Sequence, residues 1–117
     1  MIKNEKLFTA LISPSKQLEG QWIAHCLELD VVTQGCSIPN AIEMIAEAIV
    51  LCITDDIENG LDPLKRKRAP YEFWKKYSEL AAKMRIVSNS NKIPNTATYV
   101  IATLRRAQCV ELYWVGP

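Results

Sequence analysis

The sequence lacks an apolar run that approaches the roughly 20 residues a helix needs to cross a bilayer. Residues 1–6 are not followed by the long apolar stretch of a secretion signal. We therefore expect a cytoplasmic protein with neither a signal peptide nor a membrane contact. About half of the 117 residues are apolar, which is sufficient for one globular domain with a buried core.

Patterns of metal ligation are also absent. The cysteines, which show no CxxC pair and no regular spacing, are Cys26, Cys36, Cys52 and Cys109. In a chain without a secretion signal, such cysteines are typical of reduced thiols. A redox pair of Cys26 and Cys36 is an alternative, but small buried hydrophobic side chains are the favoured interpretation. We expect no metal site and no cofactor.

Histidine is scarce, and this limits the catalytic chemistry available. His25 is the single histidine, and Glu28 and Asp30 are the acids close to it in sequence. General acid–base catalysis by this group is one interpretation, but no second histidine and no paired-carboxylate constellation supports it. A half-buried strand residue that is hydrogen-bonded to a neighbour is favoured instead. We therefore expect a non-enzymatic protein without catalytic residues.

The net charge of +1 conceals a division of charge along the chain. Residues 1–62 contain three lysines and ten acids, a net charge of −7, whereas residues 63–117 contain eleven basic residues and three acids, a net charge of +8. Such asymmetry is typical of a surface for nucleic acid or for an acidic partner in one half. It is also consistent with halves that neutralise each other, within one chain or between two chains.

The first third of the chain has the pattern of a small sheet. Three short strands are predicted, at residues 7–13, 21–27 and 31–34. Pro14 ends the first strand, and the short links between strands favour an antiparallel meander. In the second strand, alternation places Trp22 and Cys26 on one face and His25 on the other. Both faces are mostly apolar, so we expect this strand in the middle of the sheet.

The strongest helical pattern follows the third strand. Ser37 is a predicted N-cap, and Pro39 lies within the first turn, where a missing N–H is harmless. Across residues 38–57, apolar side chains recur with helical spacing for over five turns. Asn59 and Gly60 supply the stop. One face of this helix must therefore pack against the sheet.

The second half of the chain is less regular. Residues 61–70 form a break with two prolines and a basic run, and a second helix is predicted at about residues 71–85. Further on, the β-branched and aromatic segments 99–103 and 110–115 favour two strands. Residues 97–108 are also compatible with a helix, so the sequence leaves open which segment completes the sheet.

Specific motifs lie between residues 25 and 48. They are His25-Cys-Leu-Glu-Leu29, then Val31-Val-Thr-Gln-Gly35, then an amphipathic helix that contains Ala41 and Ala48. In this order, the segment resembles the N-terminal domain of HicB-type antitoxins over about residues 7–60. The resemblance implies an α+β fold with a partial ribonuclease-H-like β-β-β-α-β unit, to which this chain adds a helix and one or more C-terminal strands.

The resemblance also implies a role. Proteins of this family bind and neutralise a small basic HicA-type toxin that cleaves RNA. The HicB-like domain would comprise residues 1–62 of this chain. We expect its contacts with the partner among four acids, which are Glu28, Asp30, Glu43 and Glu47.

Four positions depart from the family pattern. Leu27 replaces the usual proline, and Cys36 stands where the family often carries an acid. Pro39 and Asn40 stand where it often carries glutamates, so a Ser/Glu capping box is absent. These changes thin the negative surface that would attract a basic toxin, although the first half retains a net charge of −7.

The basic extension, residues 63–117, matches no familiar DNA-binding module. It lacks the strand-then-two-helices order of a ribbon-helix-helix, and it contains no convincing helix-turn-helix. We expect it to pack on the same core or on a second chain, and a homo-oligomer with twofold symmetry is one open alternative. Another alternative is a nucleic-acid-binding autorepressor, whose phosphate contacts would be Lys65, Arg66, Lys67, Arg68, Lys75 and Lys76.

Overall fold

The structure is a computed structural model that describes residues 6–117. The predicted α+β class is confirmed, because the structure combines one β-sheet with helices that pack on it. The elements are β1 (Leu7–Pro14), β2 (Trp22–Cys26), β3 (Val31–Gly35), α1 (Ile38–Glu58), α2 (Tyr71–Ala81), β4 (Arg85–Ile86), β5 (Tyr99–Arg105) and β6 (Gln108–Val115). Two short 3-10 helices, Pro63–Lys65 and Ser90–Lys92, interrupt the connections.

The described strands form one antiparallel sheet with the order β3-β2-β1-β5-β6-β4. The predicted meander is present, with His25 of β2 opposite both Leu11 of β1 and Val32 of β3. The second strand is interior, as expected. On the other side of β1 lies β5, where Ile101 is opposite Leu11. Both C-terminal segments are therefore strands, and the pairing partner of β1 is β5 rather than β6.

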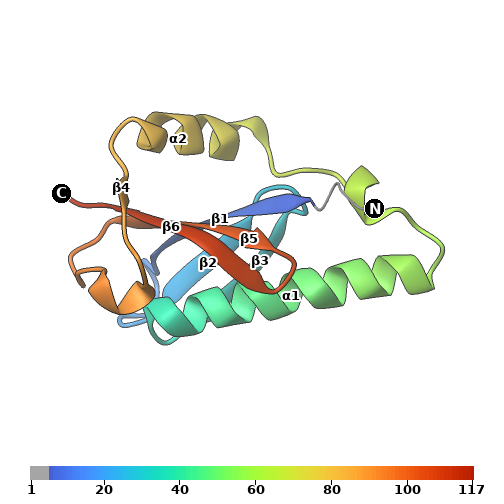
Figure 1. The fold of residues 1–117 in the computed structure, drawn as a ribbon, viewed down its shortest axis with the longest axis horizontal. Helices are drawn as coiled ribbons and strands as arrows, with labels where there is room; N and C mark the ends of the chain where they lie inside the picture. Colours follow the sequence, from blue (N-terminus) through green and yellow to red (C-terminus); the bar gives the residue numbers. More distant parts are fainter. Residues whose placement is uncertain (1–5) are drawn as a thin grey trace.

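The two helices cover opposite faces of this sheet (Figure 1). α1 runs along one face, and α2 crosses the other, so the molecule has three layers in the order helix, sheet, helix. The connection from α1 to α2 passes around one end of the sheet (Figure 1). The basic extension thus supplies one outer layer and half of the strands of the sheet.

The larger core lies between α1 and the sheet. Its fully buried members include Phe8, Ile12, Ala24, Cys26, Ile45, Ile49, Val100 and Leu104. A smaller core lies beneath α2 and contains Leu11, Leu27, Leu80, Ile101 and Val115. The alternation predicted for β2 is therefore confirmed, because Cys26 faces α1 whereas its neighbour Leu27 faces α2. Apolar burial on both faces is what stabilises a sheet of this kind.

The start of α1 is capped by two side chains. The backbone N–H of Asn40 donates to Ser37 Oγ at 3.1 Å, as predicted for an N-cap. In return, the N–H of Cys36 donates to Asn40 Oδ1 at 2.9 Å. Asn40 thus returns a bond across the start of the helix, although to the residue before the cap and not to Ser37 as a capping-box glutamate would. At the far end, Gly60 has a φ of 73°, consistent with the predicted stop.

Gly35, at the end of β3, allows α1 to approach the sheet. A Cβ atom at this position would lie 2.5 Å from the backbone nitrogen of Ala41 and 2.7 Å from its Cα. Only a residue without a side chain fits such a contact. The Gly-Cys-Ser connection therefore fixes the angle at which α1 leaves β3.

No helix in the described part of the chain has the length and apolar character that a bilayer crossing requires.

α2 is shorter than predicted and ends at Ala81 rather than near Arg85. Arg85 instead pairs with Trp114 at the start of the edge strand β4, so strand pairing ends the helical pattern. Large aromatic side chains hold α2 on the sheet, among them Phe73, Trp74 and Tyr77, with Leu80 fully buried. The indole N–H of Trp74 also donates to the carbonyl of Ala69 at 3.2 Å.

Candidate functional site

The outer face of α1 presents carboxylates directly to solvent. Glu43 and Glu47 are exposed and lie one helical turn apart on the side away from the sheet. The structure gives neither of them a hydrogen bond or an ion pair within residues 6–117. Apolar side chains are interspersed on the same face, with Met44 36% exposed and Leu51 68% exposed. This mixture of charge and apolar surface is available for a partner.

The stretch of sequence that contains this helix carries charge of one sign. Between Lys16 and Lys65 the chain contains nine acids and no lysine or arginine. Asp55 and Glu58 extend the exposed carboxylates towards the end of α1. Summed charges of one sign attract an oppositely charged partner over distances longer than a direct contact. The outer face of α1 is therefore suited to a basic protein surface.

Glu28 is already engaged within the molecule. Its carboxylate accepts a hydrogen bond from the backbone N–H of Thr9 at 2.6 Å and another from Thr9 Oγ1 at 2.9 Å. The N–H of Leu27 meanwhile donates to the carbonyl of Thr9 at 2.9 Å. These bonds attach the chain after β2 to the start of β1. Glu28 is half-buried, so its first role is structural.

Asp30 is paired with the single histidine. His25 Nε2 lies 2.8 Å from Asp30 Oδ1, and the histidine is only 8% exposed. The ring of Phe73 meets the imidazole edge-on, with ring centroids 4.6 Å apart. Asp30 adopts a φ of 55°, which Asp tolerates better than most residues. This arrangement is the neighbour-bonded strand histidine expected from the sequence.

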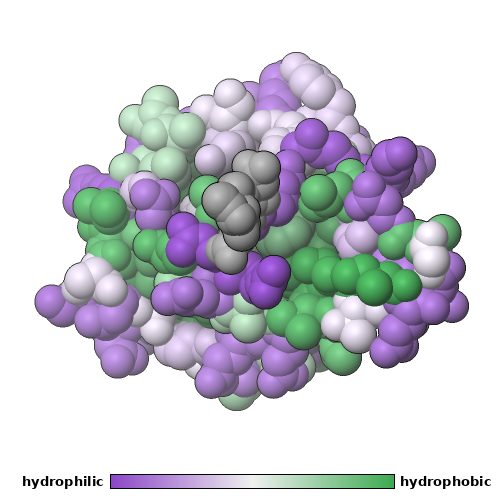
Figure 2. All heavy atoms as spheres, turned by 45° about the vertical axis from the view of Figure 1, so that its right-hand side comes forward, coloured by the Kyte–Doolittle hydropathy of each residue, from purple (hydrophilic) through white to green (hydrophobic). Residues whose placement is uncertain are grey.

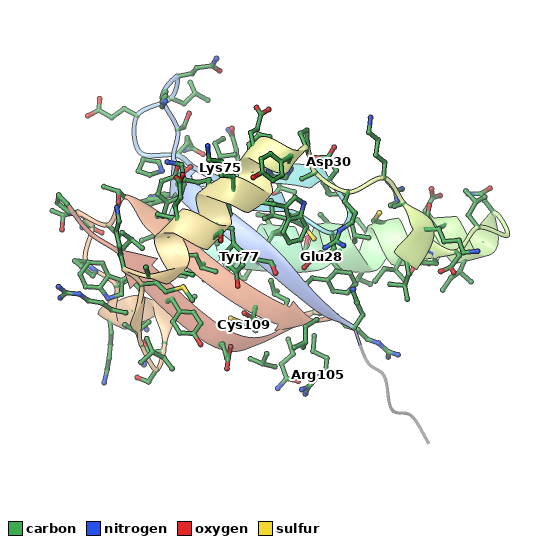
Figure 3. All side chains as sticks on the ribbon, turned by 90° about the horizontal axis from the view of Figure 1, so that it is seen from above. Glu28, Asp30, Lys75, Tyr77, Arg105 and Cys109 are labelled. Carbon is green, nitrogen blue, oxygen red and sulfur yellow. The ribbon has the colours of Figure 1, made fainter. Side chains whose placement is uncertain are left out.

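The four predicted partner contacts do not form one surface. Figure 3 looks onto the face of the sheet that α2 crosses, and Asp30 lies there near the N-terminal end of α2. Glu43 and Glu47 lie on α1, on the opposite side of the sheet. A single flat partner therefore contacts either the α1 acids or Asp30, and the α1 acids are the ones without an intramolecular partner.

A cavity of about 440 Å³ opens between α2 and the sheet. Its walls are mostly apolar, and its polar side chains are Ser13, His25, Asp30 and Lys76. His25 makes no hydrogen bond with a nucleophilic side chain among the described residues, so the His–Asp pair lacks the third member that nucleophilic catalysis uses. No group of three metal-ligating side chains occurs in residues 6–117.

The basic candidates for nucleic-acid contact differ in their availability. Arg66 is bonded to Asp56 of α1, with Nε to Oδ2 at 2.7 Å and Nη2 to Oδ1 at 3.1 Å. Arg68 stacks over the Trp74 ring at 4.3 Å from its centroid. Lys76 lies near the Tyr99 ring and 3.9 Å from Glu79. Of the six candidates, Lys65, Lys67 and Lys75 are exposed and make no such contact within residues 6–117.

The Asp56–Arg66 pair was missed by sequence reasoning, yet a signal was present. Asp56 follows Ile45, Ile49 and Cys52 on the buried stripe of α1, at a position where the helical pattern calls for an apolar residue. A carboxylate in such a stripe requires a cationic partner. The basic run that follows the helix was the nearest source of that partner.

The cysteines do not form a redox pair in this structure. Cys26 is fully buried, and burial raises the pKa of its thiol from 9.0 to about 12. Cys36 is exposed, and all four cysteines are free thiols. Burial also raises the pKa of Cys52. A thiol held so far from its ionised form is a packing group rather than a nucleophile.

Comparison of the chain with protein-family models, with curated proteins and with solved structures found no match.

Proposed function

We propose that this protein is a non-enzymatic binding protein of the HicB-like antitoxin type, which neutralises a small basic RNA-cleaving toxin of the HicA type. The observation that carries the proposal is the outer face of α1. There Glu43 and Glu47 are exposed and unpaired within the described chain, in a stretch without lysine or arginine. The contact surface thus centres on α1, and Glu28 and Asp30 contribute indirectly by holding the fold.

The order of elements supports the same proposal. The motifs around His25 and Gly35 fall on β2 and β3, and the helix with Ala41 and Ala48 is α1. This is the β-β-β-α order that the resemblance implies. In the proposed partial ribonuclease-H-like unit, β5 would supply the fourth strand, since it pairs with β1.

Neutralisation follows from charge and shape. A protein that cleaves RNA needs a cationic surface to hold the phosphate backbone. The carboxylates of α1 would occupy that surface in place of phosphates, while Met44 and Leu51 supply an apolar contact at the centre. Long-range attraction between opposite charges speeds such association, and added salt slows it. RNA and this protein would then compete for one site on the toxin.

The test is co-expression with the product of the neighbouring gene, which the proposal expects to be a small basic protein, followed by calorimetry on the purified pair. We expect binding, protection of RNA from cleavage, and an affinity that falls at least tenfold in the Glu43→Lys/Glu47→Lys variant. The matched control is Glu72→Lys/Glu79→Lys, which makes the same charge change on α2 and should bind like the wild type. Absence of binding, or equal losses in both variants, would contradict the proposal.

Nucleic-acid binding through the basic extension is the second candidate. The supporting observation is that Lys65, Lys67 and Lys75 are exposed without a partner among residues 6–117. Glu72 and Glu79 lie among the cations of α2 and weaken its attraction for phosphate. In a gel-shift assay, the protein should retard the DNA upstream of its own gene, and the retardation should weaken steeply with added salt. The variant Lys65→Gln/Lys67→Gln/Lys75→Gln should cause no retardation.

A further inference from the structure

A second surface lies where α1 ends and the following loop begins. Three large apolar side chains are exposed there within eight residues: Ile57 is 62% exposed, Leu61 60% and Leu64 60%. We call residues 55–68 with these three side chains the tip surface. Figure 2 shows hydrophobic residues gathered on the side of the molecule where α1 ends. Exposed apolar side chains that cluster in this way mark an interaction site.

The tip surface is held in one conformation by its own bonds. The Asp56–Arg66 pair ties the loop back to α1, and Asp56 is only 4% exposed. The N–H of Leu61 donates to the carbonyl of Asp56 at 2.8 Å, and Asp62 Oδ1 accepts from the N–H of Leu64 at 3.0 Å. Binding therefore requires little ordering of the loop, which reduces its entropic cost.

Charges flank the apolar side chains in a fixed order. After the internal Asp56–Arg66 pair is set aside, the tip surface carries three acids and three bases. The acids, Asp55, Glu58 and Asp62, come first, and the bases, Lys65, Lys67 and Arg68, come last. The exposed apolar side chains lie among and between them. Because this segment passes from the α1 side of the sheet to the α2 side (Figure 1), the surface is acidic towards α1, basic towards α2, and neutral in sum.

We propose that the tip surface binds a second copy of the same chain across a twofold axis. In that arrangement the acidic end of one copy faces the basic end of the other, and both apolar clusters meet at the axis. A partner of uniform charge would be attracted by one end and repelled by the other. A twofold contact is self-complementary by construction, so this distribution of charge fits it best.

The expected dimer is weak. The tip surface contributes about 14 residues per chain, whereas a stable interface uses roughly 20–30 residues a side. A dissociation constant in the micromolar range is therefore expected, with dimerisation visible only on concentration. The apolar centre of this contact is also distinct from the Glu43–Glu47 centre of the proposed toxin surface, because Glu47 and Ile57 are about 15 Å apart along α1 at the usual helical rise.

Sedimentation equilibrium of the full chain from about 1 to 500 µM tests the proposal. We expect wild-type dimers that dissociate on dilution, and at least a tenfold weaker association in Leu61→Asp/Leu64→Asp. The matched control is Glu43→Lys/Glu47→Lys, which lies outside the tip surface and should dimerise like the wild type. Circular dichroism and thermal melting of each variant separate loss of association from loss of folding.

A charge exchange tests the twofold geometry itself. Asp55→Lys/Glu58→Lys removes acids, at the loss of one long hydrogen bond from Asn59 to Asp55, and Lys65→Glu/Lys67→Glu removes bases. Asp62 and Arg68 are left intact because Asp62 caps the turn at Leu64 and Arg68 stacks on Trp74. Each variant alone should lose dimerisation at least tenfold, and an equimolar mixture should form heterodimers. A wild-type protein that stays monomeric at 500 µM overturns the proposal. So does a Leu61→Asp/Leu64→Asp variant that dimerises as strongly as the wild type, or an equimolar mixture of the two charge variants that forms no heterodimer.

Discussion

The carboxylate of Asp56 accepts two hydrogen bonds from the guanidinium of Arg66, at 2.7 and 3.1 Å. One partner is buried in α1 and the other lies in the loop beyond it, so the pair attaches this loop to the end of the helix. These bonds also raise the pKa of Arg66, because they favour its charged form.

Arg66→Ala should lower the free energy of unfolding by about 2 kcal/mol, because it leaves a buried carboxylate without a partner. Arg66→Lys should cost less, since it keeps the charge but loses the two-pronged geometry. Urea unfolding of these variants and of Asp56→Ala, combined in a double-mutant cycle, measures the coupling between the two side chains. A coupling near zero would show that the pair is not stabilising.

Gly35→Ala should destabilise the protein by about 2 kcal/mol or more, because the new methyl group collides with the backbone of α1 rather than with a flexible side chain. Gly20→Ala is the matched substitution. It has a φ of 84° but open space around it, so a backbone cost of about 1 kcal/mol is expected. Thermal unfolding compares the two. Equal losses would mean that α1 can move away from β3 without penalty.

Cys26 should resist alkylation under native conditions. With its pKa at about 12, only about one thiol in ten thousand is ionised at pH 8, and the side chain is also fully buried. Iodoacetamide labelling followed by peptide mass spectrometry should modify Cys36 first and Cys26 only after denaturation. Labelling of Cys26 in the folded protein at the rate of Cys36 would contradict the packing of β2 against α1.

The proton on His25 Nε2 should exchange slowly with water. A carboxylate can only accept a hydrogen bond, so the imidazole donates from this nitrogen to Asp30, which slows exchange of the proton with water. Proton NMR should show a ring N–H signal that disappears in Asp30→Gly, a substitution that suits the positive φ of this position. The backbone amide spectrum of the variant should otherwise be retained. Survival of the signal in Asp30→Gly would assign the proton to a different acceptor.

The local features of the fold could be predicted from sequence because short-range patterns determine them. Alternation in β2, the Ser37 cap and the glycine stop after α1 all depend on residues within a few positions of one another. The end of α2 could not be predicted in this way. Arg85 continues the helical pattern, but its pairing with Trp114, far along the chain, takes precedence over local preference.

The candidate site was predictable in part for the same reason. Exposure of Glu43 and Glu47 follows from the helical pattern, since they fall opposite the apolar stripe. Glu28 and Asp30 are only two positions apart in sequence, yet one carboxylate bonds to Thr9 and the other to His25. The backbone conformation of the turn determines where each of these side chains points. A turn has no periodic sequence pattern from which that direction could be inferred.

The pairing of β1 with β5 has a consequence for synthesis of the chain. Leu7 is opposite Arg105, so the first strand has no neighbour on one side until nearly all of the chain has been made. At usual translation rates, this leaves one edge of β1 open for about 5 to 20 seconds. A product that stops after α1 would keep that edge open permanently. The acidic first half would then be exposed to aggregation through strand addition.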